Sequence, residues 1–333
     1  MKWFRNLRQR KSKGMNTDIF FISFLANVDS SFQSLKLKDG FSVKNMSLDE
    51  CNKFVIKLKK HAPSVNENLV MPILGLNCFN NKEKVIYYIT NSIKINNNSE
   101  LDTYDYIWKY IKETGFGVFH NTSNEYLEIL VKKLKLFKEG YIDNIWNFCY
   151  YYCEDGNIMA FGLPILTQFN QTIDLKDGNY LLDSSDSQNF EIFSNEFQLP
   201  FSDNNLKLSH EYFEKSYNNN SREICFLTLM IGMEILFNKY GTELTYRISR
   251  CVGVLLGRNS NGEKSEEIIN DIKRFYKLRS FIVHNGEAKI TNADILKLRH
   301  YLRESIQELY NLNQNKDKYI PYLESLGYNQ RCK

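Results

Sequence analysis

The regular spacing of apolar residues after residue 205, interrupted by glycine and asparagine, constrains the fold of this chain most strongly. Apolar side chains that recur every three or four residues indicate amphipathic helices, and Gly or Asn just beyond the last of them indicates a helix end. Five helices are expected, over residues 208–217, 222–240, 242–256, 265–284 and 292–313. Short loops between consecutive helices make neighbours antiparallel, so residues 204–333 are predicted to form an all-α, antiparallel bundle.

The second of these helices should lie at the centre of the bundle. Its sequence, ICFLTLMIGMEILF, is apolar nearly all round, which is typical of a buried helix, and Ser221 is placed to cap it. Glu234 is embedded in this apolar sequence. An unpaired carboxylate there is costly, so Glu234 is expected to pair with Arg279, Arg250 or Arg247.

Residues 15–203 are expected to form a mixed α+β domain. Segments rich in β-branched and aromatic residues indicate strands, and these are 19–26, 85–95, 146–152 and 158–166. Helices are expected over 47–60, where Ser47 and Glu50 have capping-box spacing, and over 123–137, which Gly140 follows. The turn sequence Lys38-Asp39-Gly40 predicts a hairpin within residues 35–43. Residues 173–205 are polar and are expected to be loops and a linker, with a domain boundary near 203.

The net charge of +4 is unevenly distributed along the chain. Residues 1–14 form a basic tail, residues 14–205 carry 17 basic and 24 acidic side chains, and residues 206–333 carry 20 basic and 15 acidic ones. A positive balance on one domain suits a polyanionic partner such as a nucleic acid, although basic tails are often only solvated ends. The seven cysteines are scattered and form no CxxC pair, which favours reduced thiols over disulfides or a structural zinc. With no apolar run long enough for a membrane span and no secretory signal, a cytoplasmic location is expected.

The chemical signal lies at the end of the fourth expected helix, KRFYKLRSFIVHNG. Arg279 and His284 lie about 140° apart around a helix axis and roughly 7.5 Å apart along it. Ser280 and His284, four residues apart, share one face. RNA carries its own nucleophile, the 2′-hydroxyl, so its cleavage requires only a proton-transfer group and a cation for the phosphate. Histidine and arginine meet these two needs with no metal ion and no cofactor.

The sequence RSFIVH, which follows FYKLRS and precedes NG, resembles the ribonuclease motif of the HEPN superfamily, and most closely its Apea-like branch. The upstream sequences MEILF and ELTYRISRCVGVLLG resemble the same branch, and the resemblance covers residues 206–315. LKLFKEG at 134–140 is similar to a segment often found ahead of such domains. HEPN domains are helical bundles that usually form dimers, and many are metal-independent endoribonucleases in toxin–antitoxin and anti-phage systems.

The resemblance implies that Arg279 and His284 of two copies form one composite site that cuts RNA and leaves a 2′,3′-cyclic phosphate. Ser280 stands where the family often has Asn, Asp or His, a substitution common in the Apea-like branch. Supporting roles are expected for Ser280, Asn285, Tyr276 and Glu234, with an RNA-binding rim of Lys273, Arg274, Lys277, Arg299 and Arg303. Plainer alternatives are open for each: Tyr276 can pack in the core, Asn285 can end the helix, and the basic side chains can form a solvated face.

Three functions follow from these observations. The first is an Apea-like HEPN endoribonuclease, acting as a toxin or anti-phage effector in the cytoplasm, with RNA as substrate and a regulatory protein or ligand at residues 15–203. The second is a non-catalytic HEPN module that serves as a sensor or scaffold through dimerisation. The third is a metal-dependent nuclease in the acidic N-terminal region.

Overall fold

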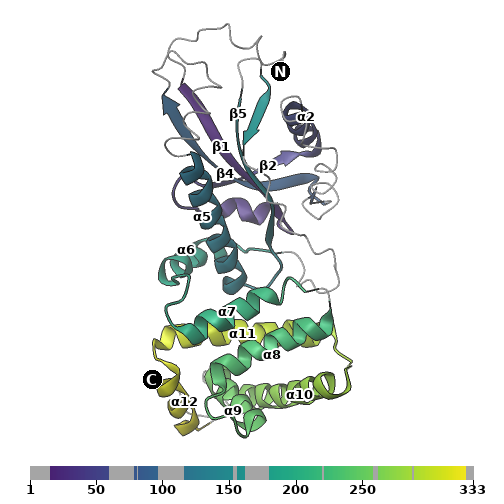
Figure 1. The fold of residues 1–333 in the computed structure, drawn as a ribbon, viewed down its shortest axis with the longest axis vertical. Helices are drawn as coiled ribbons and strands as arrows, with labels where there is room; N and C mark the ends of the chain where they lie inside the picture. Colours follow the sequence, from purple (N-terminus) through teal and green to yellow (C-terminus); the bar gives the residue numbers. More distant parts are fainter. Residues whose placement is uncertain are drawn as a thin grey trace. The chain divides into compact units, whose positions relative to one another are not determined.

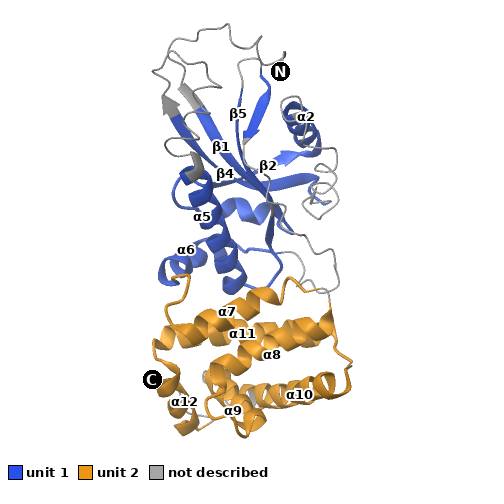
Figure 2. Cartoon of the chain, in the orientation of Figure 1, with its two compact units in different colours: residues 1–169, 178–197 blue, residues 170–177, 198–333 orange. Residues whose placement is uncertain are grey.

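The chain divides into two compact units in a computed structural model (Figure 2). The structure describes residues 16–59, 79–80, 82–96, 116–152, 156–161, 180–219, 221–257, 262–286 and 289–327. Its described residues up to 161, together with 180–197, form the first unit, and those from 198 onward form the second. The first unit combines an antiparallel sheet with helices and the second is helical, so the expected order of an α+β region followed by an all-α region is confirmed.

An antiparallel sheet forms the middle of the first unit (Figure 1). Its described strands are β1 (Asn16–Ala26), β2 (Ser42–Ser47), β3 (Phe79–Asn80), β4 (Val85–Asn96), β5 (Asp143–Tyr152) and β6 (Ile158–Phe161). The order across the sheet is β2-β4-β1-β5-β6, and β3 pairs with β4. All four expected strand segments are therefore confirmed where the structure describes them, while residues 162–166 lie outside the described residues.

Side chains on β1 alternate between two apolar layers, as the period of a strand requires. Phe21 and Leu25 pack in one layer with α5 (Phe116–Phe137) and α6 (Asp186–Glu196). Ile22 and Phe24 pack in the other with α2 (Leu48–Lys59). The buried Ser23 hydroxyl donates to Asn147 Oδ1 at 2.5 Å, which satisfies a polar pair inside the first layer.

The two helices expected in this unit are present. Helix α2 begins with the expected capping box: Glu50 N donates to Ser47 Oγ at 3.2 Å, and Ser47 N donates to Glu50 Oε2 at 2.7 Å. Helix α5 ends at Phe137, shortly before Gly140, which adopts a φ of 125°. It begins at Phe116 rather than Ser123, so the expected range of 123–137 covers only its C-terminal part.

The hairpin expected within residues 35–43 is wrong. The turn itself exists, because Phe41 N donates to Lys38 O at 3.0 Å and Gly40 has a φ of 81°. Residues 35–37 form no strand, however, and the segment before them is a short 3-10 helix, η2 (Ser30–Ser34), which Asp29 caps. The strand after the turn, β2, pairs instead with the distant β4.

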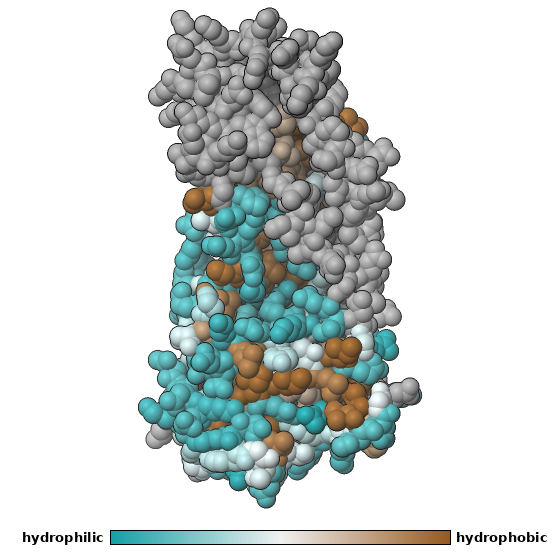
Figure 3. Space-filling model, in the orientation of Figure 1, coloured by the Kyte–Doolittle hydropathy of each residue, from teal (hydrophilic) through white to brown (hydrophobic). Residues whose placement is uncertain are grey.

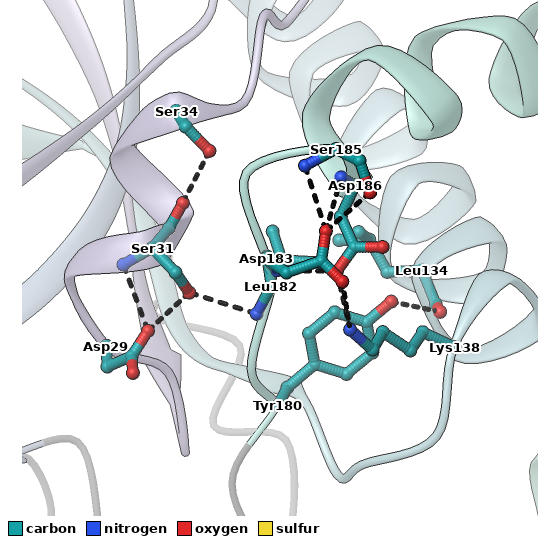
Figure 4. A network of polar contacts seen from close by, with 10 residues as sticks. All are labelled: Asp29, Ser31, Ser34, Leu134, Lys138, Tyr180, Leu182, Asp183, Ser185 and Asp186. Atoms are coloured by element: carbon teal, nitrogen blue, oxygen red, sulfur yellow. Dashed lines mark hydrogen bonds and ion pairs between the residues drawn. The ribbon is translucent and has the colours of Figure 1, made fainter.

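The linker expected over residues 173–205 is also wrong where the structure describes it, because residues 180–197 pack as part of the first unit. Figure 4 shows how their first residues are fixed. Tyr180 Oη donates to Leu134 O at 2.6 Å, and Lys138 Nζ lies 2.5 Å from Asp186 Oδ2. Asp183 Oδ1 accepts a hydrogen bond from the backbone N–H of Ser185 at 2.9 Å, which orders the start of α6. Tertiary contacts therefore order a segment whose composition resembles a loop.

The second unit is a bundle whose described helices lie in the order expected (Figure 1). They are α7 (Asn204–Lys215), α8 (Arg222–Phe237), α9 (Leu244–Gly257), α10 (Glu263–Asn285), α11 (Asn292–Leu312) and α12 (Lys316–Ser325). Five of them match the expected helices, and α12 was not expected. Helix α8 packs against all five others, which confirms its central position. No described helix is both long enough and apolar enough to cross a membrane.

Several helix ends follow directly from local sequence. Ser221 Oγ accepts from Ile224 N at the start of α8, and Thr291 and Asp294 form a reciprocal capping box at the start of α11. Gly286 ends α10 in the left-handed region, with a φ of 79°, and its N–H donates to Ile282 O. Asp203 caps α7 through Asn205 N and Leu206 N, both at 2.9 Å. The second unit already includes Gln198, a few residues before the expected boundary.

Candidate functional site

The candidate site lies at the C-terminal half of α10, where the charge of the helix changes sign. The first half of α10 contains Glu263, Glu266, Glu267 and Asp271, whereas residues 273–285 contain no acidic residue. Basic side chains near a helix C-terminus are stabilised by the helix dipole. The resulting surface is cationic and suits a phosphate group.

Arg279 is held by an ion pair with α8. Its Nε atom lies 3.3 Å from Oε1 of Glu234, and the two side chains are 36% and 18% exposed. The expected pairing of Glu234 with an arginine is thereby confirmed, and Arg279 is the partner. Because Arg279 is only partly covered, its guanidinium keeps donors available to a ligand while one edge is fixed.

Tyr276 lies one helical turn before Arg279 and is buried, with 8% of its surface exposed. Burial raises the pKa of its hydroxyl well above the ordinary value, and the nearby Glu234 carboxylate raises it further. A buried ring cannot stack a base, so the packing alternative for Tyr276 is the one that the structure supports. Tyr276 and Arg279 thus both lie near Glu234, Tyr276 in the core and Arg279 partly exposed.

His284 lies in the last turn of α10 and is exposed to solvent. It lines a shallow depression together with Lys277, Ser280, Phe281 and Asn285. Counted from Lys277, these residues occupy positions i, i+3, i+4, i+7 and i+8, so they share one face of the helix. The structure thus brings the expected residues His284, Ser280, Asn285 and Lys277 together on one surface.

Arg279 and His284 occupy different faces of the helix. Five residues correspond to about 140° of rotation, so Arg279 points toward α8 while His284 points away from it. Within the described residues, no hydrogen bond or ion pair joins these two side chains. Both are nevertheless accessible from solvent and neither is enclosed, so one copy offers its cation and its imidazole on different faces of one helix end.

The expected RNA-binding rim divides into residues that face solvent and residues that do not. Lys273 and Lys277 are exposed, and neither forms an ion pair with the part of the chain that the structure describes. Arg274 links α10 to α11, because its Nη1 atom lies 2.6 Å from Asp294 Oδ1. The Arg274 side chain remains 46% exposed, so the ion pair holds one part of its guanidinium and leaves the rest in contact with solvent.

Arg299 and Arg303 do not belong to a rim, which corrects the expectation. They are 1% and 2% exposed, and the Arg299 guanidinium donates to Ser216 Oγ at 3.1 Å and lies over the ring of Tyr217. Both arginines recur in phase with the buried residues Leu302 and Ile306 of α11, and this spacing is the signal by which the sequence marks them as internal.

Phe281 is the residue of this surface to which no role was assigned from the sequence. It is 55% exposed and lines the same depression as His284. The sequence signal was its place between Lys277 and His284 at helical spacing, on a face that otherwise carries polar side chains.

Metal ligands are not clustered in the part of the chain that the structure describes. No group of three or more His, Cys, Asp or Glu side chains is placed there to hold an ion. The four described cysteines, Cys51, Cys149, Cys225 and Cys251, are buried and not joined in disulfides, while Cys78, Cys153 and Cys332 lie outside the described residues.

Comparisons with known proteins leave the family unassigned. No protein-family model, no curated protein and no solved structure matches this chain. The likeness to HEPN proteins therefore rests on the sequence motifs of residues 206–315.

Proposed function

We propose that this protein is a metal-independent endoribonuclease of the HEPN type that acts in the cytoplasm. The observation that carries the proposal is that both side chains of the Arg-x4-His motif are accessible from solvent at one helix end. Arg279 is fixed by Glu234 but still one-third exposed, and His284 is exposed beside Ser280 in a depression with no acidic side chain. This is the set of groups that transesterification of RNA requires.

The proposed reaction uses the substrate's own 2′-hydroxyl. Its oxygen attacks the adjacent phosphorus, the bond from phosphorus to the 5′-oxygen breaks, and the 5′-oxygen gains a proton as the 2′-oxygen loses one. His284 carries out proton transfer, and Arg279 neutralises the charge that develops on the phosphoryl oxygens. The products are a 2′,3′-cyclic phosphate and a 5′-hydroxyl.

A second copy of the chain completes the proposed site. In one copy the two side chains diverge by about 140° around the helix, so a single phosphate is better enclosed by pairs from two copies. Helix α8, beside Arg279, exposes Ile224 (53%) and Ile231 (38%), and Figure 3 shows apolar residues gathered on the face of the helical unit where α8 lies. Two copies related by a twofold axis would cover such a patch, because each side of an isologous contact presents the same surface.

The proposed biological role is that of a toxin or anti-phage effector that degrades transcripts when triggered. In this proposal the first unit receives the trigger, a regulatory protein or a ligand. The role rests on the likeness of residues 206–315 to HEPN proteins of such systems.

A non-catalytic HEPN module is the second candidate, and Ser280 is the observation that favours it. The position after the arginine carries a hydroxyl where many active relatives in that superfamily carry an amide, a carboxylate or an imidazole. Such a module would keep the bundle and the contact between copies but would not cut RNA.

Cleavage of labelled single-stranded RNA by the purified full-length protein in EDTA tests the proposal. We expect metal-free cleavage that yields cyclic phosphate ends, with no cutting of DNA or of 2′-O-methyl RNA, because both lack the attacking hydroxyl. Cleavage that EDTA abolishes would instead indicate a metal-dependent nuclease. No cleavage of any RNA, with or without divalent ions, would favour the non-catalytic module.

A further inference from the structure

The C-terminal half of α10 carries three aromatic residues, and only one of them faces solvent. Phe275 and Tyr276 are 0% and 8% exposed, whereas Phe281 is 55% exposed. The helix dipole accounts for the basic side chains at this helix end, but it gives no reason for an exposed phenyl ring among them. Phe281 therefore requires an explanation of its own.

The neighbours of Phe281 distinguish a nucleic acid from a protein as its partner. Lys277, Ser280, His284 and Asn285 line the same depression, so the ring is surrounded by cationic and polar groups. The centres of protein interfaces are depleted in lysine, because burying an ammonium group without a partner is costly. A nucleotide can contact the phenyl ring and the ammonium group together, because its base has an apolar face and its phosphate is an anion.

We propose that Phe281 is a stacking platform for a nucleobase of single-stranded RNA, with Lys277 contacting a phosphate beside that base, an inference that rests on the proposed ribonuclease function. Phe281 lies three residues before His284 on one face of the helix, so a base on its ring sets the adjoining phosphodiester next to the imidazole. Stacking on an aromatic ring is available to every base and is strongest for purines. The site therefore takes unpaired strands and favours purines over pyrimidines at this position.

Binding to 2′-O-methyl oligonucleotides tests the inference, because they contain no attacking hydroxyl and cannot be cut. Fluorescence anisotropy in EDTA, with the full-length protein, compares oligoadenylate with oligouridylate. We expect Phe281→Ala to weaken oligoadenylate binding on the order of tenfold and to abolish the preference for adenylate, while Phe281→Trp retains both. Val283→Ala is the matched control, since Val283 is on the same helix, equally exposed at 55%, and outside the depression.

Three outcomes would overturn the inference. The first is wild-type affinity of Phe281→Ala for both oligonucleotides, and the second is an equal loss in Val283→Ala. The third is a change in the mass of the Phe281→Ala protein in solution, which would place Phe281 between copies of the chain. A wild-type protein that binds through Phe281 but cuts no unmodified RNA would contradict the proposed function alone. If Phe281→Ala cleaves and binds RNA as well as the wild-type protein does, only this inference is contradicted.

Discussion

The Nε atom of Arg279 lies 3.3 Å from Oε1 of Glu234, and this ion pair joins the end of α10 to the central helix α8. Glu234 is the one charged residue in the apolar segment 224–237 of α8, and the arginine that it meets is the one in the Arg-x4-His motif. The pair therefore accounts for a half-buried carboxylate on an apolar segment and holds the cation of the motif against α8.

Replacing Glu234 by Gln should reduce RNA cleavage while the protein stays folded. The amide retains the shape of the carboxylate but not its charge, so Arg279 is held less firmly, and we expect a loss of about tenfold in the cleavage rate. The free energy of unfolding should fall by only about 1 kcal/mol, because Arg279 is partly solvated. Glu324→Gln is the control, since Glu324 pairs with Arg247 at 2.6 Å and similar exposure elsewhere in the bundle. An equal loss of cleavage in both variants would show that the effect is not local.

Replacing Gly257 by Ala should destabilise the helical unit. A Cβ atom there would lie 2.8 Å from Ser265 Cα, so the close contact between α9 and α10 would have to open. We expect a loss of about 1–3 kcal/mol in the free energy of unfolding, measured with urea. Gly241→Asn provides the comparison: its backbone has a φ of 73°, which asparagine tolerates, and no atom lies within 4 Å of its Cβ position. A Gly257→Ala protein as stable as wild type would show that these helices are not packed so closely.

Replacing Arg299 by Lys should destabilise the bundle although the charge is kept. The buried guanidinium donates through Nε to Ser216 Oγ at 3.1 Å and through Nη2 to Ser216 O at 3.2 Å, and an ammonium group cannot reproduce this fork. We expect a loss of about 2–3 kcal/mol. Lys297→Met on the same helix should cost less than about 1 kcal/mol, because Lys297, which pairs with Asp271 at 2.6 Å and with Glu267 at 2.9 Å, is 38% exposed and ion pairs this exposed contribute little. Arg299→Lys should lose RNA binding only to the extent that its lower stability leaves part of the protein unfolded. A selective loss of RNA binding would contradict the buried, structural position of Arg299.

The capping carboxylate Asp294 should make stability depend on pH. Burial raises its pKa, but the hydrogen bonds from Thr291 and the ion pair with Arg274 outweigh burial, so its pKa in the folded state is below the ordinary value. The stabilisation is therefore complete above the unfolded-state pKa of about 3.9 and is lost as the pH falls through the lower folded-state value. Urea unfolding between acidic and neutral pH should show Asp294→Asn less stable than wild type at neutral pH and the difference shrinking in acid. A difference that is constant with pH would contradict this account.

Local sequence predicted the elements whose ends it controls. Ser221 caps α8 as expected, and Gly286 and Thr291 likewise delimit α10 and α11, because capping is decided by neighbouring residues. Helix α12 was not predicted, because it contains Pro321 and proline ordinarily marks a helix boundary. The buried side chains of Tyr319 and Leu323 stabilise this helix in the folded protein. The pairing of the strands was not predicted either, because β2 pairs with β4, which is distant in sequence, and no local pattern specifies that partner.

The candidate site was predictable to the same extent. Helical spacing placed Ser280 beside His284, and the cost of a buried charge indicated that Glu234 had an arginine partner. The partner of each basic residue could not be predicted in this way, because the sequence of one helix does not show which neighbouring element packs over each side chain. Arg274 is bound to Asp294 of another helix, and Arg299 contacts Ser216, which follows α7, and Cys225 of α8.

The central claim is that Arg279 and His284 cut RNA without a metal ion, and the most direct test compares the cleavage rates of Arg279→Ala, His284→Ala and wild-type protein in EDTA. Lys264→Ala, at the exposed opposite end of α10, serves as the matched control. The account predicts that both motif variants lose cleavage at least about a hundredfold while remaining folded, and that the control retains it. Undiminished cleavage by either motif variant would contradict it.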